Sequence, residues 1–338
     1  MKRTISKHAL VIFLILTFLL SWALWLVSGV LNKPIPSETR DYAWLIAQLG
    51  VFMPSAMALL ISSFTDSRQR GISWTILLLI LVPVSLLGVW IASAAPNRIL
   101  ELDTVPAILV GAAALGIVAF FSPLNRHQVE LGLEPQETRK RIGWILLSLI
   151  LLPISFLLAW LLVNASGGNS TVTVFDGNML KSLWSVALIF AFNLLFGGTL
   201  GEEIGWRGFA LPRLLERFSP LQASFMLGVV WALWHLPIDI RYGFGLTSAG
   251  AVIVRLLWTW PLTIIFTWFY LRSKRCLLVP FMLHTSGNIL PDLGFSNYEQ
   301  AIVVLSVLNA AFATAVGFRL AKSPRDKADV MNEKVTGT

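Results

Sequence analysis

The chain has 338 residues, of which 56% are hydrophobic and 13% charged, and its mean hydropathy is +0.74. Soluble domains carry about 25% charged residues, so this composition excludes an ordinary soluble protein and predicts an integral membrane protein. The single cysteine, Cys276, excludes an internal disulfide and a thiolate metal cage. The net charge of +8 does not indicate a nucleic-acid partner, because the basic residues gather in alternate loops, as membrane topology requires.

Apolar stretches of about 20 residues predict an all-α, polytopic bundle of about ten transmembrane helices, with eight as the lower bound. They lie at residues 9–31, 42–64, 73–95, 104–122, 142–163, 183–201 or beyond, 220–240, 248–271, 277–291 and 299–321. The first stretch is too long for the core of a signal peptide and lacks a small-residue cleavage site. We therefore expect it to be retained as a span.

Charge along the chain predicts the topology and the division into regions. Arg and Lys mark every second predicted loop, which places both termini in the cytoplasm and favours an even number of spans in the plasma membrane. The charged segment 125–141 separates four N-terminal spans, within residues 1–141, from a helical core at 142–321; the polar tail 322–338 is expected to be disordered. In the second span, Pro54 with Ser55, Ala56 and Ala58 predicts a face for close helix packing.

Two carboxylates and an arginine interrupt the apolar sequence after residue 200: Glu202, Glu203 and Arg207. Each charge costs roughly 2.5–3.5 kcal/mol at mid-bilayer, so it needs a partner, water or a function. On a helix, Glu203 and Arg207 are four residues apart and can pair, whereas Glu202 points about 100° away. The sequence therefore predicts one carboxylate that is held and one that is available.

Further polar residues occur inside later spans at the same spacing. Trp231 precedes His235 by four residues, and His284 precedes Asn288 by four, so each pair lies on one helix face. A lone membrane histidine most simply bonds a neighbouring carbonyl, but this number of polar groups on three spans predicts a site. His235 lies about 22 Å into its span, so Glu202 can meet it only if the preceding helix continues to about Leu214.

The ordered motifs Glu-Glu-x-x-x-Arg, aromatic-x-x-x-His and His-x-x-x-Asn resemble the CPBP family, the CAAX-prenyl-protease-2-like and bacteriocin-processing intramembrane proteases. The resemblance covers about residues 185–292 and includes the sequence from Gly205 to Gly208 and the His235-Leu236-Pro237 ending. Trp231 stands where phenylalanine is commonest in this family. The spans before residue 180 carry none of the motifs.

The resemblance implies hydrolysis of a peptide bond within the membrane. Glu202 with His235 would activate a water, and Arg207 would orient Glu203. His284 and Asn288 would donate hydrogen bonds to the oxyanion. This mechanism needs no cofactor. The alternative is a zinc ion held by Glu202, His235 and His284, although the sequence lacks the His-Glu-x-x-His signature. Arg255, also inside a predicted span, is assigned no role in the chemistry.

The partner implied is a membrane-associated peptide or protein, which a cytoplasmic opening would admit. A prenylated C-terminus, a bacteriocin leader and a signal peptide are all compatible substrates. One alternative is a non-catalytic immunity or scaffold protein of the same fold, which would not need the complete set of polar residues. Another is a transporter coupled through Glu202 and Glu203, but the N-terminal half lacks the matching repeat that such proteins show.

Overall fold

The computed structural model describes residues 2–31, 40–65, 141–167, 179–195, 197–242, 248–295 and 298–322. These residues form helices and turns and contain no β-strand. The elements are α1 (Lys2–Leu31), α2 (Arg40–Thr65), α7 (Ile142–Ala165), α8 (Met179–Leu195), α9 (Thr199–Glu203), the π-helix η4 (Ile204–Ala210), α10 (Leu211–Leu215), α11 (Pro220–Tyr242), α12 (Ser248–Arg272), α13 (Leu278–Asn288), the 3-10 helix η5 (Pro291–Leu293) and α14 (Tyr298–Ala321). The predicted all-α class is confirmed.

Six segments of the described chain are long and apolar enough to cross a membrane, and Ile46–Ser62 within α2 is a shorter apolar helix. The expected spans 73–95 and 104–122 lie outside the described residues. Residues 277–291 were expected to form a complete span, but α13 has only 11 residues. Such a helix is about 16 Å long, roughly half the hydrocarbon thickness, so α13 by itself is too short to cross the membrane.

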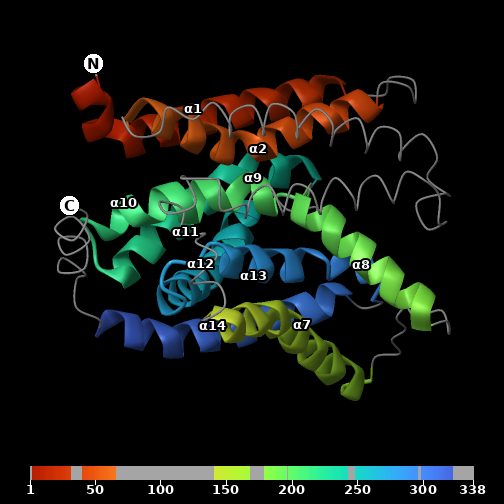
Figure 1. Ribbon diagram of the computed structural model, residues 1–338. Helices are drawn as coiled ribbons and strands as arrows, with labels where there is room; N and C mark the ends of the chain where they lie inside the picture. Colours follow the sequence, from red (N-terminus) through yellow and green to blue (C-terminus); the bar gives the residue numbers. More distant parts are fainter. Residues whose placement is uncertain are drawn as a thin grey trace.

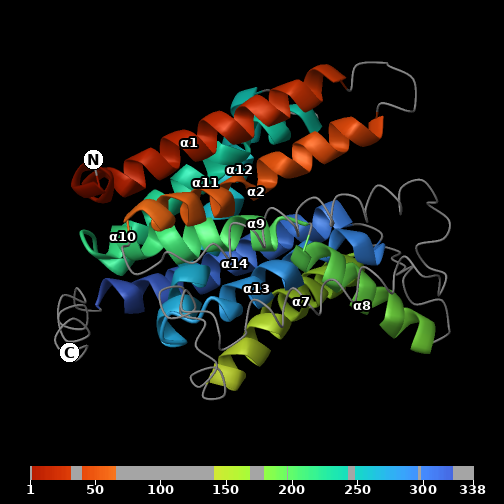
Figure 2. The same cartoon turned by 45° about the horizontal axis from the view of Figure 1, so that its top comes forward.

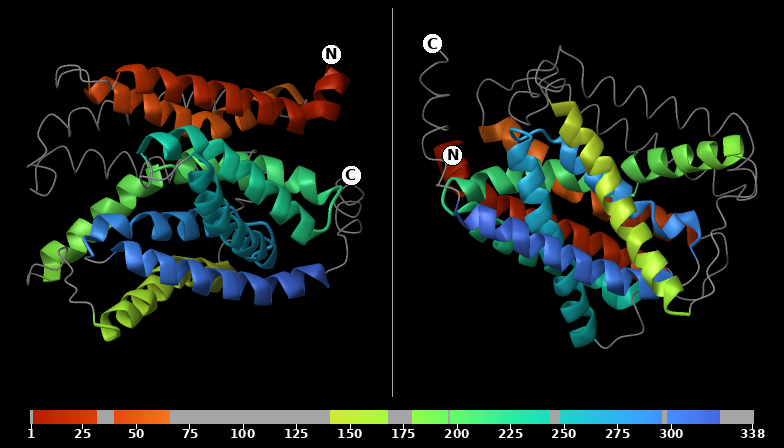
Figure 3. Two further views of the ribbon diagram at one scale, coloured as in Figure 1. Left: turned by 180° about the vertical axis from the view of Figure 1, so that it is seen from behind. Right: turned by 90° about the horizontal axis from the view of Figure 1, so that it is seen from below.

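The helices stack in layers across the molecule (Figure 1). The antiparallel pair α1 and α2 lies along one face, and α7 and α14 lie along the opposite face, as the rear view also shows (Figure 3). Between them are α9, η4 and α10, with α11 packed against α12 and α12 against α14 (Figure 2). The start of α1 and the end of α14 lie at the same end of the bundle (Figure 1). Which side of the membrane this end faces stays a prediction.

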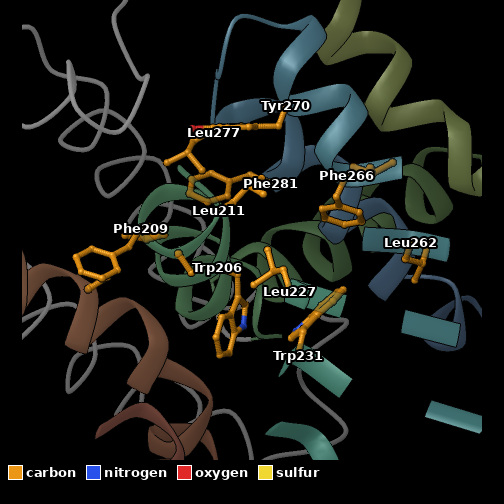
Figure 4. Packing of buried hydrophobic residues seen from close by; sticks show 14 of the residues in the cluster. Trp206, Phe209, Leu211, Leu227, Trp231, Leu262, Phe266, Tyr270, Leu277 and Phe281 are labelled. Carbon is orange, nitrogen blue, oxygen red and sulfur yellow. The ribbon is translucent and has the colours of Figure 1, made fainter. Parts of the chain in front are cut away.

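Side-chain burial follows the pattern of a protein surrounded by lipid. Along α7, the large apolar residues Leu146, Ile150 and Ile154 are exposed, whereas Ser148 and Ala159 are buried. Lipid chains solvate leucine as well as a protein interior does, so large apolar residues can face outward, while the buried face of α7 combines the small residues with Leu152 and Phe156. The buried core inside the bundle is strongly aromatic, with Trp206, Phe209, Trp231 and Phe266 among its members (Figure 4).

Helix α2 packs directly on the segment that carries the two glutamates. An ideal Cβ at Gly201 would lie 2.8 Å from the carbonyl oxygen of Val51, and one at Gly205 would lie 2.6 Å from the carbonyl carbon of Pro54. Only glycine permits this approach. The Ser55 hydroxyl also donates a hydrogen bond of 2.7 Å to the carbonyl oxygen of Leu200. The close packing predicted around Pro54 is therefore confirmed, and its partner is the helix of the candidate site.

Candidate active site

The two carboxylates lie where the backbone changes its helical geometry. The chain bends after α8 and restarts at Gly198, whose φ of 99° is left-handed and suits glycine. The helix then runs through α9, η4 and α10 to Leu215, which agrees with the extension to about Leu214 that the sequence analysis required. The seven residues of η4, from Ile204 to Ala210, are all buried. Such π-helical turns are rare and often occur at functional sites.

Glu203 and Arg207 form the predicted ion pair. Arg207 Nη1 donates to Glu203 Oε1 at 2.7 Å, and both side chains are fully buried, with 0% exposure. The guanidinium carbon also lies 4.2 Å from the ring centroid of Trp231 and 4.3 Å from that of Phe266, so ring faces cover the part of the cation that the carboxylate leaves free. The ion pair is therefore enclosed by aromatic side chains.

His284 joins this ion pair from α13. Its Nδ1 lies 2.7 Å from the same oxygen of Glu203 that Arg207 contacts. Because an ionised carboxylate can only accept, Nδ1 is the donor, and Glu203 fixes the orientation of the imidazole ring. A further hydrogen bond donated by Nε2, for example to an oxyanion, requires a proton on both ring nitrogens.

Glu202 has different surroundings from its neighbour. Its Oε2 accepts a hydrogen bond of 2.6 Å from Trp231 Nε1, and its Oε1 lies over Gly198, where an ideal Cβ would be 2.6 Å away. The residue is only 4% exposed. Glu202 is thus held by an uncharged donor, whereas Glu203 is held by a cation. This contact was not predicted, because Trp231 was interpreted only as a replacement for phenylalanine. The indole N–H was the available signal, since a buried tryptophan N–H usually finds an acceptor and a membrane carboxylate is one.

His235 lies next to Glu202 and is the more accessible member of the pair. Its Nε2 is 4.0 Å from Glu202 Oε2, and the side chains are 16% and 6% exposed, respectively. The other ring nitrogen, Nδ1, lies 2.8 Å from the backbone carbonyl of Trp231. A carbonyl can only accept, so Nδ1 carries the proton and the neutral ring presents the lone pair of Nε2 to Glu202.

Asn288 lies at the edge of this cluster rather than in its centre. Its Nδ2 donates a hydrogen bond of 2.7 Å to the carbonyl oxygen of Gly197, which ties α13 to the bend before α9. The structure therefore brings Glu202, Glu203, Arg207, His235 and His284 into one connected group. Asn288 lies four residues after His284 on α13, and its amide is bonded to the adjoining backbone.

The zinc ligands considered from the sequence are Glu202, His235 and His284. Within the part of the chain that the structure describes, no group of three or more His, Cys, Asp or Glu side chains is placed to hold a metal ion. His284 directs Nδ1 to Glu203, and Glu202 Oε2 is bonded to Trp231. Neither contact uses His284 Nε2 or His235 Nε2, the ring nitrogens that would ligate zinc, so the zinc alternative stays a prediction.

Arg255, which has no predicted role in the chemistry, forms an ion pair with Asp239. Arg255 Nε donates to Asp239 Oδ2 at 2.6 Å, and Nη2 donates to Oδ1. Asp239 is 4% exposed and lies one helical turn beyond His235 on α11. The pair joins α11 to α12, so it explains how a charge inside the predicted span is tolerated.

Two comparisons relate this chain to known proteins. Residues 182–290 match the family model described as "Type II CAAX prenyl endopeptidase Rce1-like". The chain is also 30% identical over 164 residues to the "CAAX prenyl protease 2" of Methanococcus maripaludis. This part of the chain is therefore similar to the CPBP family. The aligned part spans 47% of this chain and 59% of the relative. Together with the apolar helices, the similarity to membrane proteases indicates an integral membrane protein.

Proposed function

We propose that this chain is an intramembrane endopeptidase that hydrolyses a peptide bond in a membrane-associated peptide or protein. The observation that carries the proposal is the distance of 4.0 Å between His235 Nε2 and Glu202 Oε2. The gap is too long for a direct hydrogen bond, and both atoms are acceptors. A water molecule between them could donate one hydrogen to each, which would hold its oxygen ready for attack.

The first chemical step uses this bridging water. Glu202 takes one proton while the water oxygen attacks the carbonyl carbon of the peptide bond and a tetrahedral oxyanion forms. Glu202 is suited to this role because, among the described residues, the side-chain donor to it is the neutral indole of Trp231, whereas the charge of Glu203 is paired with Arg207. The carbon–nitrogen bond then breaks, and the proton passes from Glu202 to the leaving amine.

His284 and Asn288 are the donors that we propose for the oxyanion. In other hydrolases, removal of one such donor lowers kcat about 10²- to 10³-fold, so one correctly placed group can supply much of the oxyanion stabilisation. His284 would act through Nε2 with both ring nitrogens protonated, since Nδ1 is bonded to Glu203. Asn288 would use the second hydrogen of its amide, because the first is donated to Gly197.

Peptide cleavage by purified protein in liposomes tests the proposed activity and identifies the class of substrate. Quenched fluorescent peptides carrying a farnesylated CAAX end, the same end without the lipid, and a signal-peptide sequence would each be incubated with the wild type and with Glu202→Gln. We expect cleavage of at least one membrane-bound peptide by the wild type alone. A preference for the farnesylated peptide over its lipid-free match would extend to this chain the specificity named for its relative. Equal cleavage by both proteins would contradict the proposed role of Glu202.

A further inference from the structure

The contacts of Trp231 extend to both members of the proposed water-activating pair. Its indole Nε1 donates to Glu202 Oε2 at 2.6 Å, and its backbone carbonyl accepts from His235 Nδ1 at 2.8 Å. One residue thus meets the carboxylate through its side chain and the imidazole through its main chain. The two hydrogen bonds fix the two atoms whose separation is 4.0 Å.

The indole ring is itself immobilised by the rest of the site. Trp231 is 5% exposed, the guanidinium of Arg207 lies 4.2 Å from its ring centroid, and the ring of His284 meets it edge-on at 5.7 Å. The ring of Phe266 lies at a centroid distance of 6.0 Å from the indole, and both residues belong to the buried cluster (Figure 4). A ring held by several neighbours has few rotamers available, so its N–H has one direction.

We infer that Trp231 is a positioning residue that selects Glu202 Oε2 for contact with the water and sets its distance from His235 Nε2; this inference rests on the proposed function. A carboxylate without the indole could rotate about its terminal bond, because the absence of a Cβ at Gly198 leaves room beside Oε1. The N–H removes this freedom and leaves Oε2 one further lone pair for the water.

Trp231→Phe separates positioning from packing, because phenylalanine keeps an aromatic ring beside Arg207 and Phe266 but lacks the N–H. Trp260→Phe is the matched control: Trp260 packs on Phe225 at a centroid distance of 4.1 Å, and its buried Nε1 makes no hydrogen bond with any described residue. Both variants lose the same atoms. Only Trp231→Phe loses a hydrogen bond to a carboxylate.

The kinetic experiment uses the liposome peptide that the wild type cleaves fastest. Loss of a hydrogen bond to a charged group should lower kcat about 10- to 100-fold in Trp231→Phe. KM should change by less than about twofold, because the substrate contacts are kept, and any fall of the thermal midpoint below that of the control would reflect the same lost hydrogen bond. A kcat equal to that of Trp260→Phe would overturn the inference.

A second measurement reads the contact without any substrate. In protein labelled with ¹⁵N-tryptophan, the indole resonance of Trp231, assigned by its absence in Trp231→Phe, should move in Glu202→Gln while that of Trp260 stays. An indole chemical shift of Trp231 that is the same in Glu202→Gln and the wild type would contradict the hydrogen bond and overturn the inference. If the wild type cleaves no better than Glu202→Gln, the proposed function is overturned, and the positioning role with it. The resonance would still report whether the hydrogen bond between Trp231 and Glu202 exists.

Discussion

Glu202 and Glu203 are adjacent in the chain, yet one carboxylate is bonded to a neutral donor and the other to a cation. Glu203 Oε1 lies 2.7 Å from Arg207 Nη1 and 2.7 Å from His284 Nδ1, whereas Glu202 Oε2 accepts from the neutral indole of Trp231. Successive residues on a helix point about 100° apart, which lets one turn present two carboxylates to different neighbours. The first prediction follows from this difference.

Glu203→Gln should destabilise the protein, and Glu202→Gln should not. Arg207 is fully buried, and removal of the carboxylate leaves its charge without a counter-ion. Breaking a buried ion pair in this way costs about 3–5 kcal/mol. Thermal unfolding in detergent, followed by size-exclusion chromatography, measures both variants. Equal midpoints for Glu203→Gln and the wild type would contradict the assignment of Glu203 as the charge partner.

Gly205→Ala should weaken the packing of α2 on η4. The new methyl would lie 2.6 Å from the backbone of Pro54, and neither helix backbone can move without disturbing the site. Overpacking of this kind costs about 1–3 kcal/mol. Gly143→Ala is the control, since a Cβ at that position meets nothing within 4 Å. The prediction fails if the two alanine variants have the same midpoint.

The Asp239–Arg255 pair should behave as a unit. Asp239→Asn alone and Arg255→Gln alone each leave a charge inside the bundle, whereas the double variant leaves two neutral side chains that can still bond. We therefore expect the double variant to be more stable than the sum of the single effects implies. The free energies of unfolding of all four proteins give the coupling. Additive effects would show that the two residues do not depend on each other.

Chelation should leave the activity intact if the glutamate and water mechanism holds. The wild type would be incubated with 1,10-phenanthroline, dialysed and assayed with the cleaved peptide, with and without added Zn²⁺. Unchanged activity is expected, because this mechanism activates the water through Glu202 and His235 alone. Loss of activity that zinc restores would support the alternative mechanism.

The sequence predicts the parts of the site that depend on helical spacing. The Glu203–Arg207 pair follows from two opposite charges four residues apart, and the extension of the helix beyond Gly201 follows from the depth of His235. The packing at Pro54 follows from its small neighbours. Each of these expectations follows from regular helix geometry, from the free-energy cost of a charge in a membrane, or from the size of the side chains.

Other features depend on departures from regular helices and were not predictable in this way. Neither the bend at Gly198 nor the π-helical turn after Glu203 has a distinctive pattern in an apolar sequence. The short helix α13 looks like a span because the apolar stretch continues past its end at Asn288. The bond from Trp231 to Glu202 joins residues 29 positions apart, and such contacts come from packing.

The measurement that tests the central claim most directly compares peptides from cells that produce the wild type with peptides from cells that produce Glu202→Gln at matched expression. Membrane and secreted fractions would be analysed by mass spectrometry for new termini. The proposed mechanism predicts at least one terminus that is present with the wild type and absent with Glu202→Gln. Identical peptides in both cells, with any binding or immunity phenotype also unchanged, would contradict the proposed hydrolysis and favour a non-catalytic scaffold.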